Sequence, residues 1–277
     1  MSDIILWRYL TFEQLEDILD TSTLFFTHRD QIPEYEEGKI PDNSAEQYRE
    51  WAEQCYTGVK IMHSLMGVET VASTYNLESI VQGEMKKTED FINNTYFVCF
   101  RKDKFFSQTV KNALNKHLAI KISYSKLSTY WKNIGLYTIS SDIYYTQNRN
   151  SINALKRLNL LLNVPNIWED EQEFRILLPL NDDYKTYLYK VHLEDLEEKG
   201  ILPEDDDDKD LYMSKKEYDL FRRLQSEIIE DENNHGVKVP FDTSIIEEIY
   251  IPIDKYDEYS KKYPEFTNKL RIIDANS

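Results

Sequence analysis

The chain has 277 residues, of which 50 are acidic and 33 are Lys or Arg, and its formal net charge at pH 7 is −17. Aromatic residues make up 13% of the chain, which indicates a folded protein with a sizeable core. The acidic balance excludes a nucleic-acid-binding surface built on bulk charge, because phosphate backbones require a basic stripe. The net charge does not exclude a local basic pocket for a small phosphate ligand.

Cysteine and glycine usage excludes several classes of motif. Cys55 and Cys99 show neither CxxC nor Cys/His ligand spacing, so we expect two buried reduced thiols and no metal centre. The seven glycines are too scattered for GxGxxG or GxxxxGK, and GxSxG is absent, which excludes these nucleotide-binding and hydrolase motifs. The first residues lack a signal-peptide pattern, and no apolar run approaches ~20 residues. We therefore expect a cytoplasmic protein without membrane contact.

The first predicted elements are two short strands separated by a helix. Apolar and aromatic residues dominate 4–9 and 24–27, which favours strands. Between them, Thr11 and Gln14 form a capping box, and apolar residues follow it at helical spacing. A polar, acidic loop is expected after the second strand.

A helical insertion is expected at about 44–93. Ser44 and Gln47 form a second capping box at its start, and helix is expected to resume at about 76–91. The apolar residues of the first helical stretch are Trp51, Cys55, Ile61, Met62, Leu65 and Met66.

The remaining chain mixes strands and helices without the strict alternation of a parallel α/β sheet. Alternating apolar side chains predict a half-buried strand at 171–180, and the acidic run at 204–210 is expected to be a solvated loop. We therefore predict an α+β fold, in which a central mixed or antiparallel sheet is flanked by helices, as a single domain over 1–277. The other predicted strands are 95–101, 118–123, 142–146, 185–193, 245–253 and 269–273, and the other predicted helices are 103–116, 127–131, 150–162, 214–232 and 254–263.

Four segments carry a family resemblance. They are LWRYLTFEQLEDILDTSTLFFTHRDQIPEYEEGKIP at 6–41, TYFVCF at 95–100, WEDEQEFRIL at 168–177 and IIEEIYIPIDKYDEY at 245–259. Together they resemble the domain-of-unknown-function family twenty-nine-seventy-one of bacteria and phages, whose most diagnostic pattern is aromatic-x-x-Glu-x-Glu-x-Arg. The chain departs from that family where SQTVKNALNKH lacks its Met-Trp-x-x-Tyr helix. The resemblance implies no settled activity.

A looser similarity runs to ADP-ribosyltransferase-like folds, which place a basic residue or His on the first strand and a Glu on a later one. It implies an enzyme that cleaves NAD, in which Glu173 stabilises the ribosyl cation and Glu171 orients the acceptor. Arg8 and Tyr9 would hold the nucleotide, with Arg8 binding the pyrophosphate through both arms of its guanidinium.

His28 and Arg175 complete the expected cofactor site. His28 follows a predicted strand, where it suits acid-base work or stacking on a base, although a surface loop histidine fits the same pattern. The hypothesis requires Arg8, His28 and Glu173 to converge within roughly 10 Å of a common ligand position. The alternative is a solvated strand face on which Glu171 or Glu173 pairs with Arg175 or Arg8.

Two further functions stay open. One is a non-catalytic module that binds a nucleotide as a sensor or effector of bacterial or phage conflict, with a deep basic and aromatic pocket. The other is a protein-interaction module whose acidic surface imitates nucleic acid toward a basic protein partner. A continuous acidic ridge would favour the second, and scattered charge would speak against it.

Overall fold

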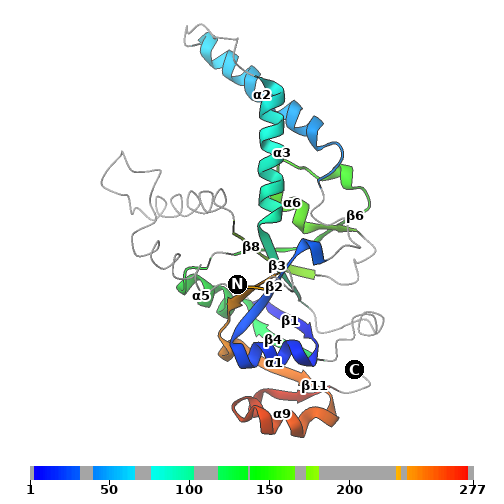
Figure 1. The fold of residues 1–277 in the computed structure, drawn as a ribbon, viewed down its shortest axis with the longest axis vertical. Coiled ribbons are helices and arrows are strands. Elements are labelled where there is room, and N and C mark those ends of the chain that lie inside the picture. The colour runs from blue at the N-terminus through cyan, green and yellow to red at the C-terminus, as the bar shows by residue number, and fades with distance from the viewer. Residues whose placement is uncertain are drawn as a thin grey trace, which may run out of the picture.

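Ten strands form one sheet at the centre of the part of the chain that the structure describes (Figure 1). In this computed structural model only β11 and β12 pair in parallel within that sheet, so it is mixed and mainly antiparallel, which confirms the predicted α+β class. The main path runs through β12 (Leu270–Ile272), β11 (Ile246–Ile251), β4 (Leu118–Ser123), β1 (Ile5–Leu10), β3 (Thr95–Arg101), β2 (Thr23–His28), β10 (Gly236–Pro240) and β9 (Ile229–Asp231). The described residues are 3–31, 40–65, 76–102, 118–136, 138–165, 173–180, 229–231 and 236–273.

The sheet divides at β3. Along its whole length, β3 pairs with β8 (Glu173–Pro179), which also pairs with β5 (Ile139–Asp142). The other edge of β3 is therefore shared by two strands, because a strand has only two edges. β1 pairs there at Arg101, and β2 pairs there at Phe97 and Tyr96. Between these two contacts, β1 and β2 diverge and leave part of the β3 edge without a strand partner.

One hydrophobic core lies on the sheet face that carries Leu6 and Leu10 of β1. The helix after β1 begins as predicted, since the Thr11 hydroxyl accepts a hydrogen bond from the Gln14 main-chain N–H at 3.3 Å. The Gln14 side chain in turn accepts one from the Thr11 main-chain N–H at 3.0 Å. The helices that contribute to this core are α1 (Phe12–Thr21), α5 (Tyr124–Asn133) and α9 (Tyr256–Lys262).

A second core lies on the opposite face of β3 and β8. Phe97 and Leu177 stand directly opposite each other on these strands, and both are buried. They pack with residues of α3 (Leu77–Asn93) and α6 (Arg157–Leu162), beside a separate two-stranded sheet. The strands of that small sheet are β6 (Tyr144–Thr146) and β7 (Asn163–Pro165).

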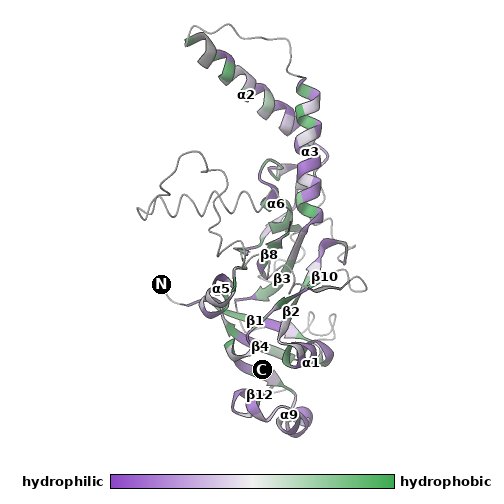
Figure 2. Cartoon of the chain, turned by 60° about the vertical axis from the view of Figure 1, so that its left-hand side comes forward, coloured by the Kyte–Doolittle hydropathy of each residue, from purple (hydrophilic) through white to green (hydrophobic). Residues whose placement is uncertain are grey.

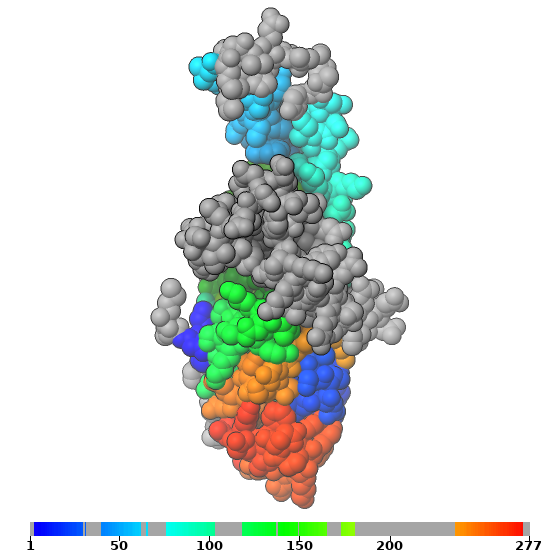
Figure 3. Space-filling model, turned by 90° about the vertical axis from the view of Figure 1, so that its left-hand side faces the viewer, coloured from blue at the N-terminus to red at the C-terminus, as the bar shows by residue number. Residues whose placement is uncertain are grey.

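The helices α2 (Ser44–Leu65) and α3 form an arm that projects from the sheet (Figures 1 and 2). A small core of Tyr48, Val81 and Ala154 holds its base. The Tyr48 hydroxyl donates to the Ala154 carbonyl at 2.9 Å and lies 2.5 Å from the Thr88 hydroxyl. Figure 3 shows the arm at one end of the molecule and α9 with the last strand at the other.

Two predicted helices differ from the structure. The helix predicted at 150–162 is wrong in its first half, where the chain forms a short 3-10 turn at Arg149–Ser151 and α6 begins only at Arg157. The Asn153 side chain accepts a hydrogen bond from the Leu155 main-chain N–H, and such local bonds compete with helix. The helix predicted at 214–232 is wrong at its end, because 229–231 forms β9 on the edge of β10.

The two cysteines are less buried than predicted. Cys55 is exposed and Cys99 is half-buried, so the expectation of two buried thiols is wrong, and neither thiol forms a disulfide. The segments predicted at 103–116, 185–193 and 204–210 lie outside the described residues.

Gly236 of β10 has no room for a side chain. It stands opposite Thr27, and a Cβ there would lie 2.1 Å from the Phe25 ring and 2.5 Å from the main-chain oxygen of Phe26. Because a backbone oxygen cannot swing aside, we expect Gly236→Ala to lower the free energy of unfolding by about 1–3 kcal/mol in urea titrations. Gly83→Ala is the control, since a Cβ there meets nothing within 4 Å and should stabilise α3 by roughly 0.5–1 kcal/mol. Equal effects of the two substitutions would contradict this explanation.

Candidate functional site

Glu173 and Arg175 form an ion pair at the start of β8. The two side chains lie on the same face, because residues two apart on a strand point the same way. Arg175 Nε donates to Glu173 Oε1 at 2.8 Å, and Arg175 Nη2 donates to Glu173 Oε2 at 3.2 Å. The Arg175 side chain is 1% exposed and that of Glu173 is 10% exposed. The pair is therefore bidentate and nearly buried, and it engages both carboxylate oxygens.

The same guanidinium is tied to two further elements. Arg175 Nη1 donates to the main-chain oxygen of Leu161 in α6 at 2.7 Å, and Arg175 Cζ lies 4.3 Å from the centre of the Phe97 ring. The main-chain N–H of Glu173 donates to the Tyr145 hydroxyl at 2.9 Å. Through these contacts the ion pair connects β8 with β3, α6 and β6.

Arg8 lies on the opposite face of the sheet from Glu173. Trp7 pairs with Arg101 and Arg101 pairs with Glu173, so these three share a face, while Arg8 alternates to the other. Arg8 Nη1 donates to the main-chain oxygen of Cys99 at 2.9 Å, in the part of the β3 edge that β1 and β2 leave open. Arg8 therefore satisfies a carbonyl at the division of the sheet.

Burial dominates the electrostatics of Arg8. Its Cζ lies 5.7 Å from the centre of the Phe100 ring, and its Nε is buried without a hydrogen-bond partner. Burial lowers the pKa of Arg8, and the nearby Cys99 and Glu173 oppose this by raising it.

His28 lies at the far end of β3 from Glu173. It pairs with Tyr96, whereas Glu173 pairs with Arg101, five residues along the strand, which is roughly 17 Å at ~3.4 Å per residue. The His28 Nε2 atom is 3.0 Å from the main-chain oxygen of Asn93, and its ring packs against the Tyr96 ring. Arg8, His28 and Glu173 therefore do not converge as the NAD-cleavage hypothesis requires.

The remaining predicted site residues are Tyr9 and Glu171. Tyr9 is half-buried and shares the face of Trp7, two residues away on β1, and so lies on the Glu173 side. Glu171 lies outside the described residues. The sequence reasoning missed Arg101, which is 7% exposed and directly opposite Glu173. The signal for it was present, because an arginine ends an otherwise apolar strand.

A second candidate surface lies on α2. One side of this helix packs on α3, where Tyr48 is 2% exposed and Ala52 is 4% exposed. At about 100° per residue, the side that carries Gln54 and Ile61 lies roughly half a turn away from the packed side. From 57 to 65, every side chain that the structure describes on α2 is exposed. The second half of α2 extends beyond α3, as Figure 1 shows.

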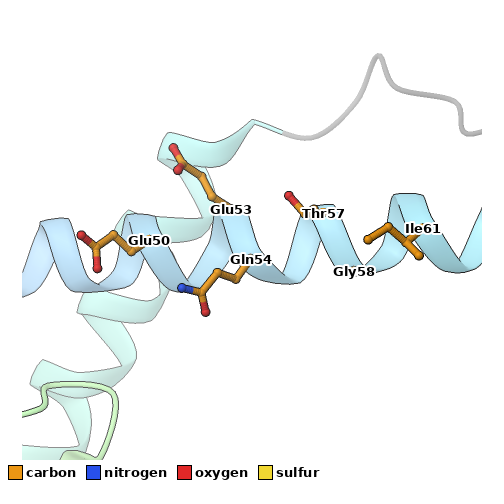
Figure 4. A pocket seen from close by; sticks show the side chains of 6 residues that line it. All are labelled: Glu50, Glu53, Gln54, Thr57, Gly58 and Ile61. Carbon is orange, nitrogen blue, oxygen red and sulfur yellow. The ribbon is translucent and has the colours of Figure 1, made fainter.

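The outward side of α2 carries a shallow, open depression of about 500 Å³, which we call the α2 groove (Figure 4). Ile61 at one end of it is 57% exposed, and Leu65, one turn further on, is 82% exposed. The spacing of 54, 58, 61 and 65 repeats at four, three and four residues, so these positions follow one another along one stripe. The described residues that line the groove are Glu50, Glu53, Gln54, Thr57, Gly58 and Ile61.

The sequence reasoning placed Trp51, Ile61 and Leu65 at helical spacing without separating the side that packs on α3 from the side that faces solvent. The signal was the aliphatic pair Ile61 and Leu65 falling on the same stripe as Glu50 and Gln54. An apolar pair on this side departs from the polar outer side that is typical of a surface helix.

No family model, curated protein or solved structure matches the chain. The family resemblance and NAD binding therefore stay predictions. In the part of the chain that the structure describes, no three His, Cys, Asp or Glu side chains are grouped to hold a metal ion. No described helix is both long and apolar enough to cross a membrane.

Proposed function

We propose that this chain is a non-catalytic protein-interaction module that binds its partner through the α2 groove and Leu65. The observation that carries the proposal is the exposure of Ile61 and Leu65, one turn apart, on the half of α2 that extends beyond α3. Full burial of such side chains stabilises a complex by about 1.5–3 kcal/mol each, before the costs of association. Both side chains stay exposed in the part of the chain that the structure describes, so a partner that covers them would recover that free energy.

The ion pair of Glu173 supports a non-catalytic role. A carboxylate that stabilises a ribosyl cation needs its charge directed at the ligand, whereas both oxygens of Glu173 accept hydrogen bonds from Arg175. The same guanidinium is held by Leu161, so releasing the carboxylate would disrupt a buried junction. The geometry favours a structural task for these residues.

The proposed surface is tested by site-specific photo-crosslinking in the full chain. A photoreactive residue is introduced at Ile61 or at Leu65, and at Glu89, an exposed position on α3, as the control. We expect one discrete adduct from both α2 positions and none from Glu89, with the partner and its attachment point identified by mass spectrometry. Labelling that is absent from α2, or as strong from Glu89, would refute the proposed function.

The catalytic alternative is tested on the same protein with labelled NAD. We expect neither the wild type nor Glu173→Gln to hydrolyse NAD or transfer its ADP-ribose. Turnover by the wild type that the substitution abolishes, in a variant with unchanged circular dichroism, would establish an enzyme and overturn the non-catalytic part of the proposal.

A further inference from the structure

The two carboxylates of the α2 groove have no ion-pair partner among the described residues. Glu50 and Glu53 lie at one end of the groove, and neither forms an ion pair with any residue that the structure describes. The neighbouring Arg49 is already paired with Glu78 of α3 at 3.0 Å. The groove therefore presents two open carboxylates at one end and two exposed aliphatic side chains, Ile61 and Leu65, at the other.

Gly58 lies midway along this stripe. A Cβ built on it meets nothing within 4 Å, so no contact inside the chain requires a glycine there. Glycine in a helix interior costs roughly 0.5–1 kcal/mol relative to alanine. What it offers is a bare stretch of helix backbone, which lets a second helix approach closely between the acidic and the aliphatic ends.

We propose that the α2 groove binds a basic, amphipathic helical segment of a partner protein. Its cationic side chains pair with Glu50 and Glu53, its backbone crosses at Gly58, and its apolar side chains cover Ile61 and Leu65. The segment lies along about 22 Å of α2, from Glu50 to Leu65, at ~1.5 Å per residue. This inference rests on the proposed function and names the chemistry of the partner.

A second copy of the chain fits the same surface poorly. In a parallel pairing, Glu50 and Glu53 would face their own copies, and like charges repel. In an antiparallel pairing they would face Ile61 and Leu65 of the other copy, beside Lys60, whose ammonium already lies 4.4 Å from the centre of the Tyr56 ring. The opposite-charge helix satisfies both ends of the groove at once, and the net charge of −17 steers a basic partner toward this chain.

The test uses two synthetic helical peptides of about 18 residues, long enough to span the groove. Both carry the same leucine stripe, and one has lysine where the other has glutamate. Fluorescence anisotropy with the full chain should show binding of the lysine peptide that weakens as salt rises, and no binding of the glutamate peptide. Glu50→Lys/Glu53→Lys should weaken the lysine peptide by roughly tenfold or more and create binding of the glutamate peptide.

Two further variants separate the parts of the surface. Gly58→Leu should abolish binding of the lysine peptide by filling the crossing point. Glu89→Lys/Glu265→Lys makes the same change in net charge at exposed positions away from the groove, and it should bind the lysine peptide nearly as well as the wild type. Circular dichroism confirms that each variant is folded.

Three outcomes would overturn the inference. One is that the two double variants weaken binding of the lysine peptide equally, which would show that net charge alone explains the loss of affinity. Another is an absence of lysine-peptide binding to the wild type, and the third is a concentration-dependent dimer in sedimentation that Leu65→Ser abolishes. Crosslinks from Ile61 and Leu65 together with any of these would leave the proposed function standing with a different partner, whereas absent crosslinks would remove the proposed function itself.

Discussion

Arg175→Met should lower the free energy of unfolding by about 3–5 kcal/mol, measured by urea titration at pH 7. The substitution removes the hydrogen bonds of Arg175 to Glu173 and Leu161, and it leaves the nearly buried Glu173 carboxylate and the Leu161 carbonyl without the partner they have in the native chain. An uncompensated charge in a site that is 10% exposed costs far more than the net contribution of the intact pair. The loss is a large fraction of the total stability of a typical domain.

The control for Arg175 is an exposed pair of the same chemistry. Arg49 and Glu78 lie 3.0 Å apart with side chains 44% and 57% exposed, so Arg49→Met should cost less than about 1 kcal/mol. If Arg175→Met leaves too little folded protein to measure, Glu173→Gln/Arg175→Met should recover part of the loss by removing the buried charge. A loss below about 1 kcal/mol at Arg175 would show that the pair is dispensable for stability, and would reopen Glu173 as a catalytic carboxylate.

Trp131→Ala should lower the free energy of unfolding by about 3–5 kcal/mol. Trp131 is 1% exposed at the end of α5, packs 5.6 Å from the Phe26 ring, and donates from Nε1 to the main-chain oxygen of Pro240 at 2.9 Å. The substitution leaves a cavity between α5 and the sheet and an unpaired carbonyl at the end of β10. Urea unfolding followed by circular dichroism measures the loss.

Trp51→Ala provides the matched comparison for Trp131. Trp51 is 37% exposed on α2, so its truncation should change stability by less than about 1 kcal/mol. The same residue borders the outward side of α2, where its loss should weaken partner binding instead. Comparable losses of stability at both tryptophans would mean that α2 is packed more tightly than its exposure indicates.

Polar residues have different roles in the sheet and in the arm. At the division of the sheet, Arg8 and Arg175 donate to main-chain oxygens and hold strands and helices together. On the arm, Glu50 and Glu53 lie open beside exposed aliphatic side chains. The first arrangement stabilises the fold, and the second is suited to recognition.

The pairing of Glu173 with Arg175 is one of the pairings that the alternative of a solvated strand face left open, and the strand period of two allows it without knowledge of the rest of the fold. The prediction that Arg8 and His28 join them did not hold, because it depends on register between strands far apart in the chain. The pairing of Trp7 with Arg101 turns Arg8 to the opposite face, and a shift of one residue would have reversed this. No local pattern in β1 carries that information.

Local patterns in the sequence determined the elements whose boundaries depend on short-range contacts. The capping box of Thr11, the existence of a strand at β8 and the helical stretches of the arm follow from bonds and spacings within a few residues. The predicted capping box of Ser44 and Gln47 is wrong, because the Gln47 side chain bonds Ile152 and Ala154 instead. The prediction that β8 is half-buried is also wrong, because the two cores cover both of its faces. Tertiary structure alone decided that 229–231 is a strand and that one side of α2 faces solvent. It also decided that the Arg8 side chain donates to the Cys99 main-chain oxygen where the sheet divides. Each of these depends on contacts between residues distant in the chain, whose free energies outweigh local preference and leave no trace in local periodicity.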